Sequence, residues 1–573
     1  MNWRLIPLVL IGLLAGMPFK TASGETRLSG AVSGVWEVRG SPFTIIGDIT
    51  LARNETLRIQ PGVTVTFAGN FRFNVNGQLT AEGTSDSPIV FQGSSQQPGS
   101  WRGIYFSGNG SDRSIVSHCV IRYAYQGFNL DDSDPQISNC SISFCTDTGV
   151  AFSRSLGKLT DCKIFRISGS GLKISGSSRA TVRSCSIATC GDNGIVVTDA
   201  AAPTLDHNYI GGVSDHGIHL NSAAACSVVY NVIYQAGVRG LSISESNGAL
   251  VLHNVTDGAT GQGAYLYRSS GVQLINNTIL NSGENGVQVS SNVTGNIENN
   301  IIENSDGYGI LLQGGNPRCD YNNLHNNADG DYHDVAAGQH DMHIPSSLDG
   351  NYNPHQGNGL IDAGDPTLPQ DPDGTRADIG AGFFNQNSAP NIRSVTPNWQ
   401  QDTTIVADTI LFTANVVDAQ GHFVVWKWFV NGNEEWRNTS FNRIFNRDGE
   451  YTVRLLVDDR YYLGQSEYIW HFFVEGASVD PDIELPEGYA LSEVYPNPFN
   501  GILNLKLSIP IHERVSISLL DLNGRFLESI STGELNAGDH QINFDAGSLP
   551  SGSYLIQAEL GNYKLIRRTS LLK

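Results

Sequence analysis

One short phrase, glycine–apolar–any–apolar, recurs ten times between Trp101 and about Gly330. Its ten glycines are Gly103, Gly127, Gly149, Gly171, Gly194, Gly217, Gly240, Gly263, Gly286 and Gly309. Successive glycines lie 24, 22 and 22 residues apart and then 23 residues apart six times. A period this regular is typical of a solenoid, in which each repeat covers the apolar face of its neighbour.

A second column of the repeat holds a thiol or a small polar residue, 13 to 16 residues after each glycine. This column consists of Cys119, Cys140, Cys162, Cys185, Asn208, Asn231, Asn254, Asn277, Asn300 and Asn322. The sequence alternates with period two at both places, which predicts strands. Two or three short strands per turn indicate a right-handed parallel β-helix, with asparagines stacked and hydrogen-bonded at one inward bend. A leucine-rich repeat is excluded, because its leucine–asparagine spacing and its helical segment are missing.

Eight cysteines would ordinarily predict disulfides if the chain is exported from the cytoplasm. Four of them occupy the column that asparagine fills in later repeats, and Cys145 and Cys190 each follow a cysteine of that column by five residues. Adjacent rungs about 4.8 Å apart fit disulfide geometry poorly. We therefore predict buried free thiols, with Cys226 and Cys319 isolated. No Cys-x-x-Cys or paired-histidine spacing indicates a metal site, so we predict none.

The chain has 573 residues and a formal charge of −21, with acidic residues scattered along it. An acidic chain without a basic stripe argues against nucleic acid as a partner. Residues 1–24 have the pattern of a signal peptide: Arg4, the apolar run Leu5–Met17, and small residues before a cleavage site. We predict export, and no transmembrane segment after the signal peptide is removed.

The predicted β-helix spans residues 25–388, with an N-terminal cap at 25–100, regular rungs at 101–330 and a closing segment at 331–388. The amino-acid sequences of Leu57–Val63, Gly77–Thr84 and Trp101–Ile104 resemble the N-terminal segments of a class of secreted bacterial proteins. This class has the pectin-lyase-like right-handed parallel β-helix fold. Gly359–Asp365 and Asp371–Ala381 resemble the closing segment of the same class. The resemblance implies the architecture and names no reaction.

The acidic segment Asp371–Asp378 has two interpretations. It carries the oxygens and the glycine of a calcium loop, although not the full spacing of an EF-hand. The alternative, which we favour, is a turn-rich cap in which Arg376 pairs with an aspartate. Calcium is the one cofactor that the sequence suggests, and nothing else in it supports that suggestion.

Aperiodic strands with more aromatic residues occupy residues 389–476 and predict a β-sandwich. Its tryptophan pair and the phrase Gly449–Val453 resemble a polycystic-kidney-disease-type (PKD) immunoglobulin-like domain. Trp426 and Trp428 have the same parity on one strand, so we expect both to face the core. The expected fold class is therefore all-β: a right-handed parallel β-helix solenoid followed by two small β-sandwich domains.

A linker rich in Asp and Pro is predicted at residues 477–490. Residues 491–573 closely resemble the type A C-terminal sorting domain of the type IX secretion system; a second spacer domain is the alternative. The sorting motif consists of Tyr495, Pro496, Asn497, Pro498, Phe499 and Asn500. The resemblance implies the type IX secretion machinery as a partner, and a destination outside a Gram-negative cell or on its surface.

Chemistry on a β-helix is expected on the outer face of its parallel sheets, where an extended polymer can lie. Outward positions of rungs four to eight gather charged and aromatic side chains within about 24 Å. The candidate substrate-binding residues are Lys173, Asp192, Asp215, His216, His219, Arg239 and Tyr265. Stacked carboxylates can raise one another's pKa, and a cation beside a carboxylate suits uronate binding and proton abstraction.

Two functions remain open at this point. The chain is a secreted protein that binds a polysaccharide or cell-surface glycan, and if it is an enzyme it is a polysaccharide lyase or a glycoside hydrolase. Alternatively it is a surface adhesin or structural protein without turnover. Val196 and Ser242 interrupt the candidate columns, and no catalytic residue can be assigned from them.

Overall fold

The computed structural model describes residues 26–399, 403–406, 408–475, 489–492, 494–522, 524–547, 549–560 and 563–572. The predicted signal peptide and residues 477–488 of the predicted linker lie outside the described residues. Two compact units divide between Ser388 and Ala389, and Tyr461–Gly464 groups with the first unit. Each unit is described by itself below.

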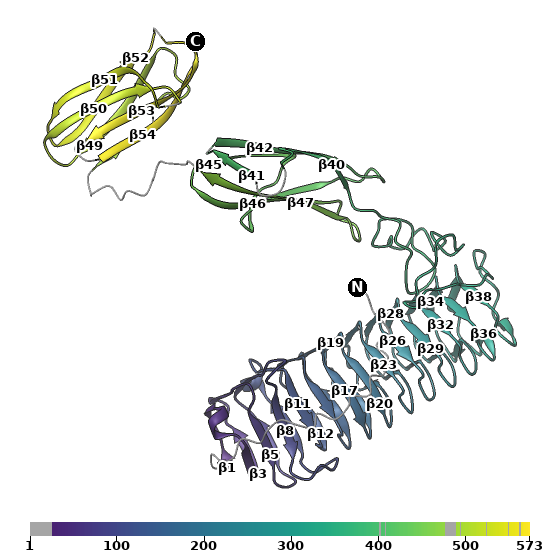
Figure 1. Ribbon diagram of the computed structural model, residues 1–573. Helices are drawn as coiled ribbons and strands as arrows, with labels where there is room; N and C mark the ends of the chain where they lie inside the picture. The colour runs from purple at the N-terminus through teal and green to yellow at the C-terminus, as the bar shows by residue number, and fades with distance from the viewer. Residues whose placement is uncertain are drawn as a thin grey trace. The chain divides into compact units, whose positions relative to one another are not determined.

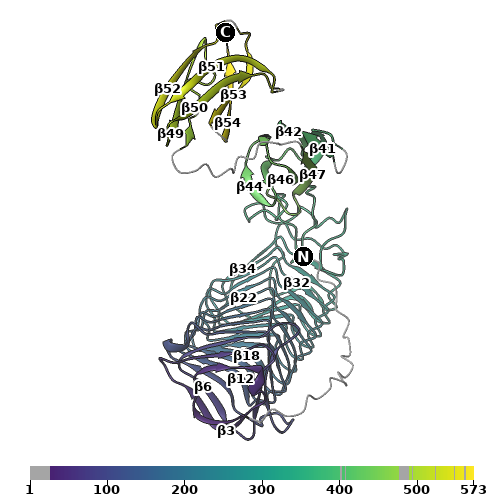
Figure 2. The same cartoon turned by 60° about the vertical axis from the view of Figure 1, so that its left-hand side comes forward.

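The first unit is a parallel β-solenoid whose strands stack in three columns (Figure 1). Figure 2 shows successive rungs lying over one another. Within each regular turn the chain runs from the third column to the second, bends, and then forms the first. The description of the fold as an all-β right-handed solenoid is confirmed, with 13 strands in the third column.

The first column carries the strands that follow the repeat glycines. It contains β6 (Arg72–Val75), β9 (Gly103–Ser107), β12 (Gln126–Asp131), β15 (Thr148–Ser153), β18 (Ser170–Ser175), β21 (Ile195–Val197), β24 (Ile218–Asn221), β27 (Leu241–Ser244), β30 (Ala264–Tyr267), β33 (Val287–Ser290), β36 (Tyr308–Leu312) and β39 (Gly330–His333). Two irregular strands precede it, β1 (Thr26–Ala31) and β3 (Phe43–Leu51), and β3 pairs into both the first and the second columns.

The second column carries the strands that follow the cysteine and asparagine positions. It contains β5 (Thr64–Phe67), β8 (Ile89–Gly93), β11 (Cys119–Arg122), β14 (Ser141–Ser143), β17 (Lys163–Ile167), β20 (Ser186–Cys190), β23 (Tyr209–Gly211), β26 (Val232–Tyr234), β29 (Val255–Asp257), β32 (Thr278–Leu280), β35 (Ile301–Glu303) and β38 (Asn323–His325).

The third column is a separate sheet in which all strands are also parallel. It contains β2 (Gly34–Trp36), β4 (Thr56–Ile59), β7 (Gln78–Glu82), β10 (Ile115–Ser117), β13 (Gln136–Ser138), β16 (Lys158–Thr160), β19 (Thr181–Arg183), β22 (Thr204–Asp206), β25 (Ser227–Val229), β28 (Leu250–Leu252), β31 (Val272–Ile275), β34 (Gly295–Glu298) and β37 (Arg318–Asp320). Two short 3-10 turns, Val38–Gly40 and Asn109–Ser111, complete the described elements of the solenoid.

Close packing between rungs explains the repeating glycine. A Cβ atom at Gly217 would lie 2.3 Å from Cγ2 of Ile233 and 2.7 Å from the carbonyl oxygen of Gly240. Ile233 is a core residue of the next rung, so any side chain at position 217 would push the two rungs apart. The same close approach to an isoleucine of the next rung recurs at Gly194 and Gly286.

The asparagine column forms a continuous hydrogen-bonded ladder, as predicted. Asn231 is fully buried, and its Nδ2 donates to the carbonyl oxygen of Leu205 and to Oδ1 of Asn254, both at 2.9 Å. Its backbone N–H also donates to Oδ1 of Asn254 at 3.0 Å. Each amide therefore satisfies buried backbone groups of its own bend and of the neighbouring rungs, which would otherwise cost free energy.

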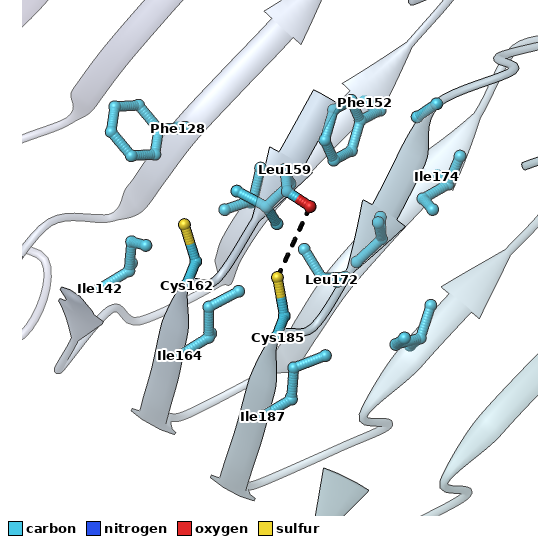
Figure 3. Packing of buried hydrophobic residues seen from close by; sticks show 14 of the residues in the cluster. Phe128, Ile142, Phe152, Leu159, Cys162, Ile164, Leu172, Ile174, Cys185 and Ile187 are labelled. Atoms are coloured by element: carbon cyan, nitrogen blue, oxygen red, sulfur yellow. Dashed lines mark hydrogen bonds between the residues drawn. The ribbon is translucent and has the colours of Figure 1, made fainter. Parts of the chain in front are cut away.

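Four cysteines, Cys119, Cys140, Cys162 and Cys185, continue the same column; all eight cysteines have free thiols in the structure, seven of them buried and Cys319 half-buried. Figure 3 shows Cys162 and Cys185 stacked among the core isoleucines and phenylalanines. Sγ of Cys185 donates to the carbonyl oxygen of Leu159 at 3.6 Å. Burial raises the pKa of the Cys145 thiol to about 12, so this side chain stays protonated and behaves as a small apolar residue.

The closing segment folds back against the outer face of the second column. Nδ2 of Asn276 donates to the carbonyl oxygen of Asp378 at 2.9 Å, and the N–H of Ala381 donates to Oγ1 of Thr278 at 2.9 Å. Ile301, Leu360 and Ile379 form a small core of their own between the segment and the solenoid. The end of the second column is thereby covered.

The second unit begins with a β-sandwich. One sheet contains β40 (Asn391–Thr396), β42 (Asp408–Val417) and β45 (Ser440–Phe445); the other contains β41 (Thr403–Val406), β47 (Gln465–Glu475), β46 (Gly449–Asp458), β43 (Val425–Val430) and β44 (Asn433–Trp436). Trp428 is fully buried against Phe412 and Trp470, whereas Trp426 is half-buried and packs on the edge of this core. Membership of the PKD type stays a prediction.

The last domain is a second two-sheet sandwich. Its sheets contain β48 (Ala490–Leu491), β49 (Ile502–Ile509) and β52 (Gly538–Asp545), and β51 (Phe526–Leu535), β50 (Glu513–Leu520), β53 (Gly552–Leu560) and β54 (Tyr563–Leu571). Within the predicted sorting motif, Oδ1 of Asn497 accepts the N–H of Ser570 at 3.0 Å. Phe499 is buried, and its carbonyl oxygen accepts the N–H of Leu572 at 2.9 Å. The motif therefore holds the final strand in place.

Replacing one asparagine of the ladder should destabilise the solenoid. In Asn254→Ala, the buried N–H of Asn231 and the carbonyl oxygen of Val228 lose their partners. We expect the free energy of unfolding in urea to fall by about 2–4 kcal/mol. The exposed Asn221→Ala, at the end of β24, should change it by less than about 0.5 kcal/mol. Equal effects of the two substitutions would contradict the role of the ladder.

Candidate functional site

The outward positions of the first column lie in strict register. Lys173, Val196, His219, Ser242 and Tyr265 are paired neighbours on β18, β21, β24, β27 and β30. The predicted outer column is thus present. Residues that precede the repeat glycines approach it from the adjoining bend and complete a cluster around His219.

Two histidines form the centre of this cluster. The rings of His216 and His219 meet edge to face, with centroids 4.7 Å apart and an interplanar angle of 86°. Burial, followed by the nearby His219 and Arg239, lowers the pKa of His216 to about 4. Burial also lowers the pKa of His219, and Arg239 adds to this while Asp215 opposes it. The His216 imidazole is therefore uncharged at neutral pH.

Two carboxylates lie beside the histidines. Burial raises the pKa of Asp215, and the neighbouring carboxylate of Asp192 raises it further. Asp192 is held in place by Oγ of Ser170, which donates at 2.7 Å, and by Nδ2 of Asn193, which donates at 2.9 Å. A carboxyl with a raised pKa beside histidines with lowered pKa values is an arrangement that can move protons.

One ring nitrogen of His216 has no hydrogen-bond partner among the described residues. Nδ1 of His216 lies 3.2 Å from Oδ1 of Asp215, but the two atoms lack the geometry of a hydrogen bond. This nitrogen is also buried. An unsatisfied buried nitrogen in a polar cluster is commonly associated with function rather than stability.

A cation and an aromatic ring close the other side of the cluster. The guanidinium carbon of Arg239 lies 3.8 Å from the ring centroid of Tyr265, which is the geometry of a cation–π contact. Nε of Arg239 donates to Oε1 of Gln262 at 2.7 Å, and Gln262 in turn donates to Glu284. The guanidinium is therefore fixed in orientation before any ligand arrives.

Six of the seven predicted residues come together in this way, and Lys173 does not. Lys173 is exposed in the same column, two rungs from His219, and within the described ranges it makes no hydrogen bond or ion pair with the others. Ser242 is completely buried beneath its neighbours. The short side chain of Ser242 does not leave a gap in the column, because the longer side chains of the adjacent rungs cover it.

Gln262 and Glu284 belong to the cluster but were not predicted. Gln262 directly precedes the repeat glycine Gly263, as His216 and Arg239 precede theirs, and Glu284 comes two residues before Gly286. Following the position before the glycine through every repeat would have identified Gln262. Glu284 occupies the same repeat position as Asp192 and Asp215, two residues before the glycine, so following that position through every repeat would have identified it as well.

The acidic closing segment has the arrangement of a turn-rich cap. Oδ2 of Asp371 accepts the N–H of Asp378 at 2.8 Å, and both carboxylate oxygens of Asp378 accept backbone N–H groups. The expected pairing of Arg376 with an aspartate is replaced by bonds to backbone, because its Nε donates to the carbonyl oxygen of Gly364 at 2.5 Å. Burial, followed by the carboxylates of its neighbours, raises the pKa of Asp371 to about 8.

Two protein-family profiles match the chain. Residues 80–233 and 193–340 match the right handed beta helix region, and residues 493–571 match the secretion system C-terminal sorting domain. The sorting domain is of the type IX kind and indicates secretion to the cell surface or the extracellular space. In the described part of the chain, no helix has the length and apolarity needed to span a membrane. A search of curated proteins gives no match.

Several solved structures are similar to part of this chain at low identity. The periplasmic alginate epimerase AlgG is 13% identical over 53% of this chain and 77% of that chain, with a TM-score of 0.32. The Azotobacter vinelandii mannuronan C-5 epimerase AlgE4 A-module is 13% identical over 55% and 89%, with a TM-score of 0.28. Pectate lyase Pel9A is 14% identical over 57% and 89%, also at 0.28. These similarities assign no reaction to this chain.

Stability of the closing segment should fall as the pH rises. The folded segment holds a proton on Asp371 up to about pH 8, and burial raises the pKa of Asp378 to about 6. An unfolded aspartate loses its proton near pH 4. The stabilisation is complete below that pH and disappears as the pH rises through 8. Limited proteolysis should therefore cut the segment faster at pH 9 than at pH 6.

The variant Asp371→Asn gives the control for this pH dependence. An amide mimics the protonated carboxyl and can still accept the N–H of Asp378. We expect the variant to be cut at nearly the same rate at pH 6 and pH 9. A wild-type chain that is cut equally fast at both pH values would show that these carboxyls titrate normally.

Proposed function

We propose that this exported β-helix binds an extended, uronate-containing polysaccharide along the outer face of its first column. The binding residues are Asp192, Asp215, His216, His219, Arg239 and Tyr265. The observation that carries the proposal is the oriented guanidinium of Arg239, stacked on Tyr265 beside two histidines of lowered pKa. The β-helix and sorting-domain matches support a secreted, carbohydrate-related protein.

The geometry of the face suits a polymer. Rungs of a parallel sheet repeat about every 4.8 Å, a spacing close to the length of one sugar in an extended chain. A chain that runs along the solenoid axis would therefore meet a new rung with nearly every sugar. The second column is covered by the closing segment at its end, whereas the cluster around His219 lies on the first column.

Arg239 is suited to recognise a sugar carboxylate. In the described part of the chain, only its Nε has a hydrogen-bond partner, so the terminal nitrogens can form the paired hydrogen bonds that guanidinium groups make with carboxylates. The stack on Tyr265 and the bond to Gln262 reduce the entropy lost on binding, because the side chain is already ordered.

The histidines and Asp215 favour a lyase as the reaction class, if the bound chain is also cleaved. In β-elimination a base removes the proton next to the uronate carboxylate, a C=C bond forms, and the bond to the leaving oxygen breaks. An uncharged His219 can take the first proton, and Asp215, whose pKa is raised by burial, can carry one to the leaving oxygen. A non-catalytic adhesin would use the same face for binding alone.

Removing the guanidinium should weaken binding. In Arg239→Ala we expect the affinity for a polyuronate, measured by calorimetry with the mature chain, to fall about tenfold to a hundredfold, because a charge-assisted hydrogen bond contributes about 1.5–3 kcal/mol. Arg183→Ala is the matched control, since Arg183 is an exposed arginine of the third column that pairs with Asp206. The proposed site would be contradicted if Arg239→Ala left the affinity for the polyuronate unchanged. It would also be contradicted if Arg183→Ala weakened binding as much as Arg239→Ala does.

Substitution of His219 separates binding from turnover. If the face is catalytic, His219→Ala should lower the rate at which an unsaturated product appears by about a hundredfold while affinity changes much less. Wild-type chain that binds polyuronate without releasing product would establish the adhesin function in place of the lyase. A chain that binds neither acidic nor neutral glycans would contradict both.

A further inference from the structure

Three metal-ligating side chains converge in the β-sandwich that follows the solenoid. Asp418 and His422 lie in the loop between β42 and β43, and Asp459 directly follows β46. One ligand atom from each of them lies within 4.8 Å of the other two. Nδ1 of His422 is 3.7 Å from Oδ1 of Asp418 and 3.9 Å from Oδ2 of Asp459. Among the described residues this is the one such group of three.

Both carboxylates of the group are withdrawn from water. The side chain of Asp459 is 0% exposed and that of Asp418 is 3% exposed, whereas His422 is 22% exposed. Two carboxylates buried within a few ångströms of each other repel strongly unless a cation neutralises them. His422 reaches the pair from the side that is open to solvent.

The carboxylate of Asp418 is only half satisfied. Its Oδ1 accepts the backbone N–H groups of Gln420 at 3.0 Å and of His422 at 2.8 Å, so the loop itself fixes the orientation of the carboxylate. Its Oδ2 is buried and has no hydrogen-bond partner in the described part of the chain. A buried ionised oxygen without a partner costs free energy, and a bound cation would remove that cost.

We propose that Asp418, His422 and Asp459 bind a divalent transition-metal ion, with Zn²⁺ as the best-suited probe. Zinc binds imidazole nitrogen and carboxylate oxygen at about 2.0–2.2 Å, so in its tetrahedral geometry two ligand atoms stand about 3.4 Å apart. The distances from His422 to the two aspartates exceed this value by about 0.3–0.5 Å, a gap that small side-chain rotations close. The imidazole disfavours Ca²⁺ and Mg²⁺, which prefer oxygen ligands alone.

Such an ion would act as a cross-link within the sandwich. It ties the loop after β42 to the end of β46, which belong to different sheets of the domain. The chain has no cysteine after Cys319, so a disulfide is not available to this domain. A metal bound only by the folded state stabilises that state in proportion to its free concentration. The site is independent of the proposed sugar-binding face.

The test measures zinc binding to the tag-free mature chain. After treatment with EDTA, titration with Zn²⁺ should show a site that is lost in Asp418→Asn, and the melting temperature of the sandwich transition should rise by about 5 °C or more at saturation. Equal concentrations of Ca²⁺ should give a much smaller rise. The asparagine retains the oxygen that accepts the two loop N–H groups, so the loop should keep its conformation.

Two further variants guard against misfolding and against other zinc sites. His422→Asn should weaken zinc binding at least about tenfold, whereas His471→Asn, which changes an exposed histidine of β47, should leave it unchanged. Near-ultraviolet circular dichroism of each metal-free variant reports whether the tryptophan core is intact. Zinc titration and melting curves that are the same for folded wild type, Asp418→Asn and His422→Asn would overturn the proposal, as would a wild type that gains no stability from Zn²⁺.

Discussion

The solenoid depends on hydrogen bonds that cross from one rung to the next at a single buried bend. An asparagine there donates its side-chain amide to the side chain of the asparagine in the next rung, as Asn208 does to Asn231 and Asn231 does to Asn254. This contact makes the number of residues per turn almost constant, because an insertion between the bends would move one amide out of reach. The steady 23-residue period is the sequence expression of that constraint.

Uniform rungs also determine where chemistry can be placed. The core side of each strand is filled by isoleucine, valine and phenylalanine, so polar function is confined to outward positions and bends. On the first column a bend residue such as His216 and an outward residue such as His219 come from the same rung and still touch. Neighbouring rungs add Asp192 and Arg239, so a cluster arises from residues about 23 positions apart without any change to the fold.

Much of this could be predicted from the sequence, for a physical reason. Strand alternation and the fixed period predict which side chains lie on the same face. The outward column that contains His219 and Tyr265 could therefore be predicted from the sequence. Contacts across rungs are not, because they depend on the length and rotamer of each side chain: Arg239 reaches Tyr265, whereas Lys173 stays apart in the same column.

Structures formed by distant, aperiodic segments gave no comparable signal. The closing segment contacts Thr278 through Ala381, about a hundred residues further along the chain, and no repeat in the sequence predicts this contact. Arg376 was expected to pair with an aspartate and instead binds backbone carbonyl oxygens, since the aspartates are already occupied by backbone N–H groups. The convergence of Asp418, His422 and Asp459 likewise requires two sheets to be packed first.

Oxidative footprinting of the mature chain tests the central claim, that the first column is the polysaccharide-binding face. With a bound oligouronide, the side chains of His219 and Tyr265 should be oxidised several-fold more slowly than without it. Tyr209 and Tyr234, which are exposed on the second column, should be oxidised at the same rate in both conditions. Protection of Tyr209 and Tyr234 with no change at Tyr265 would contradict the account.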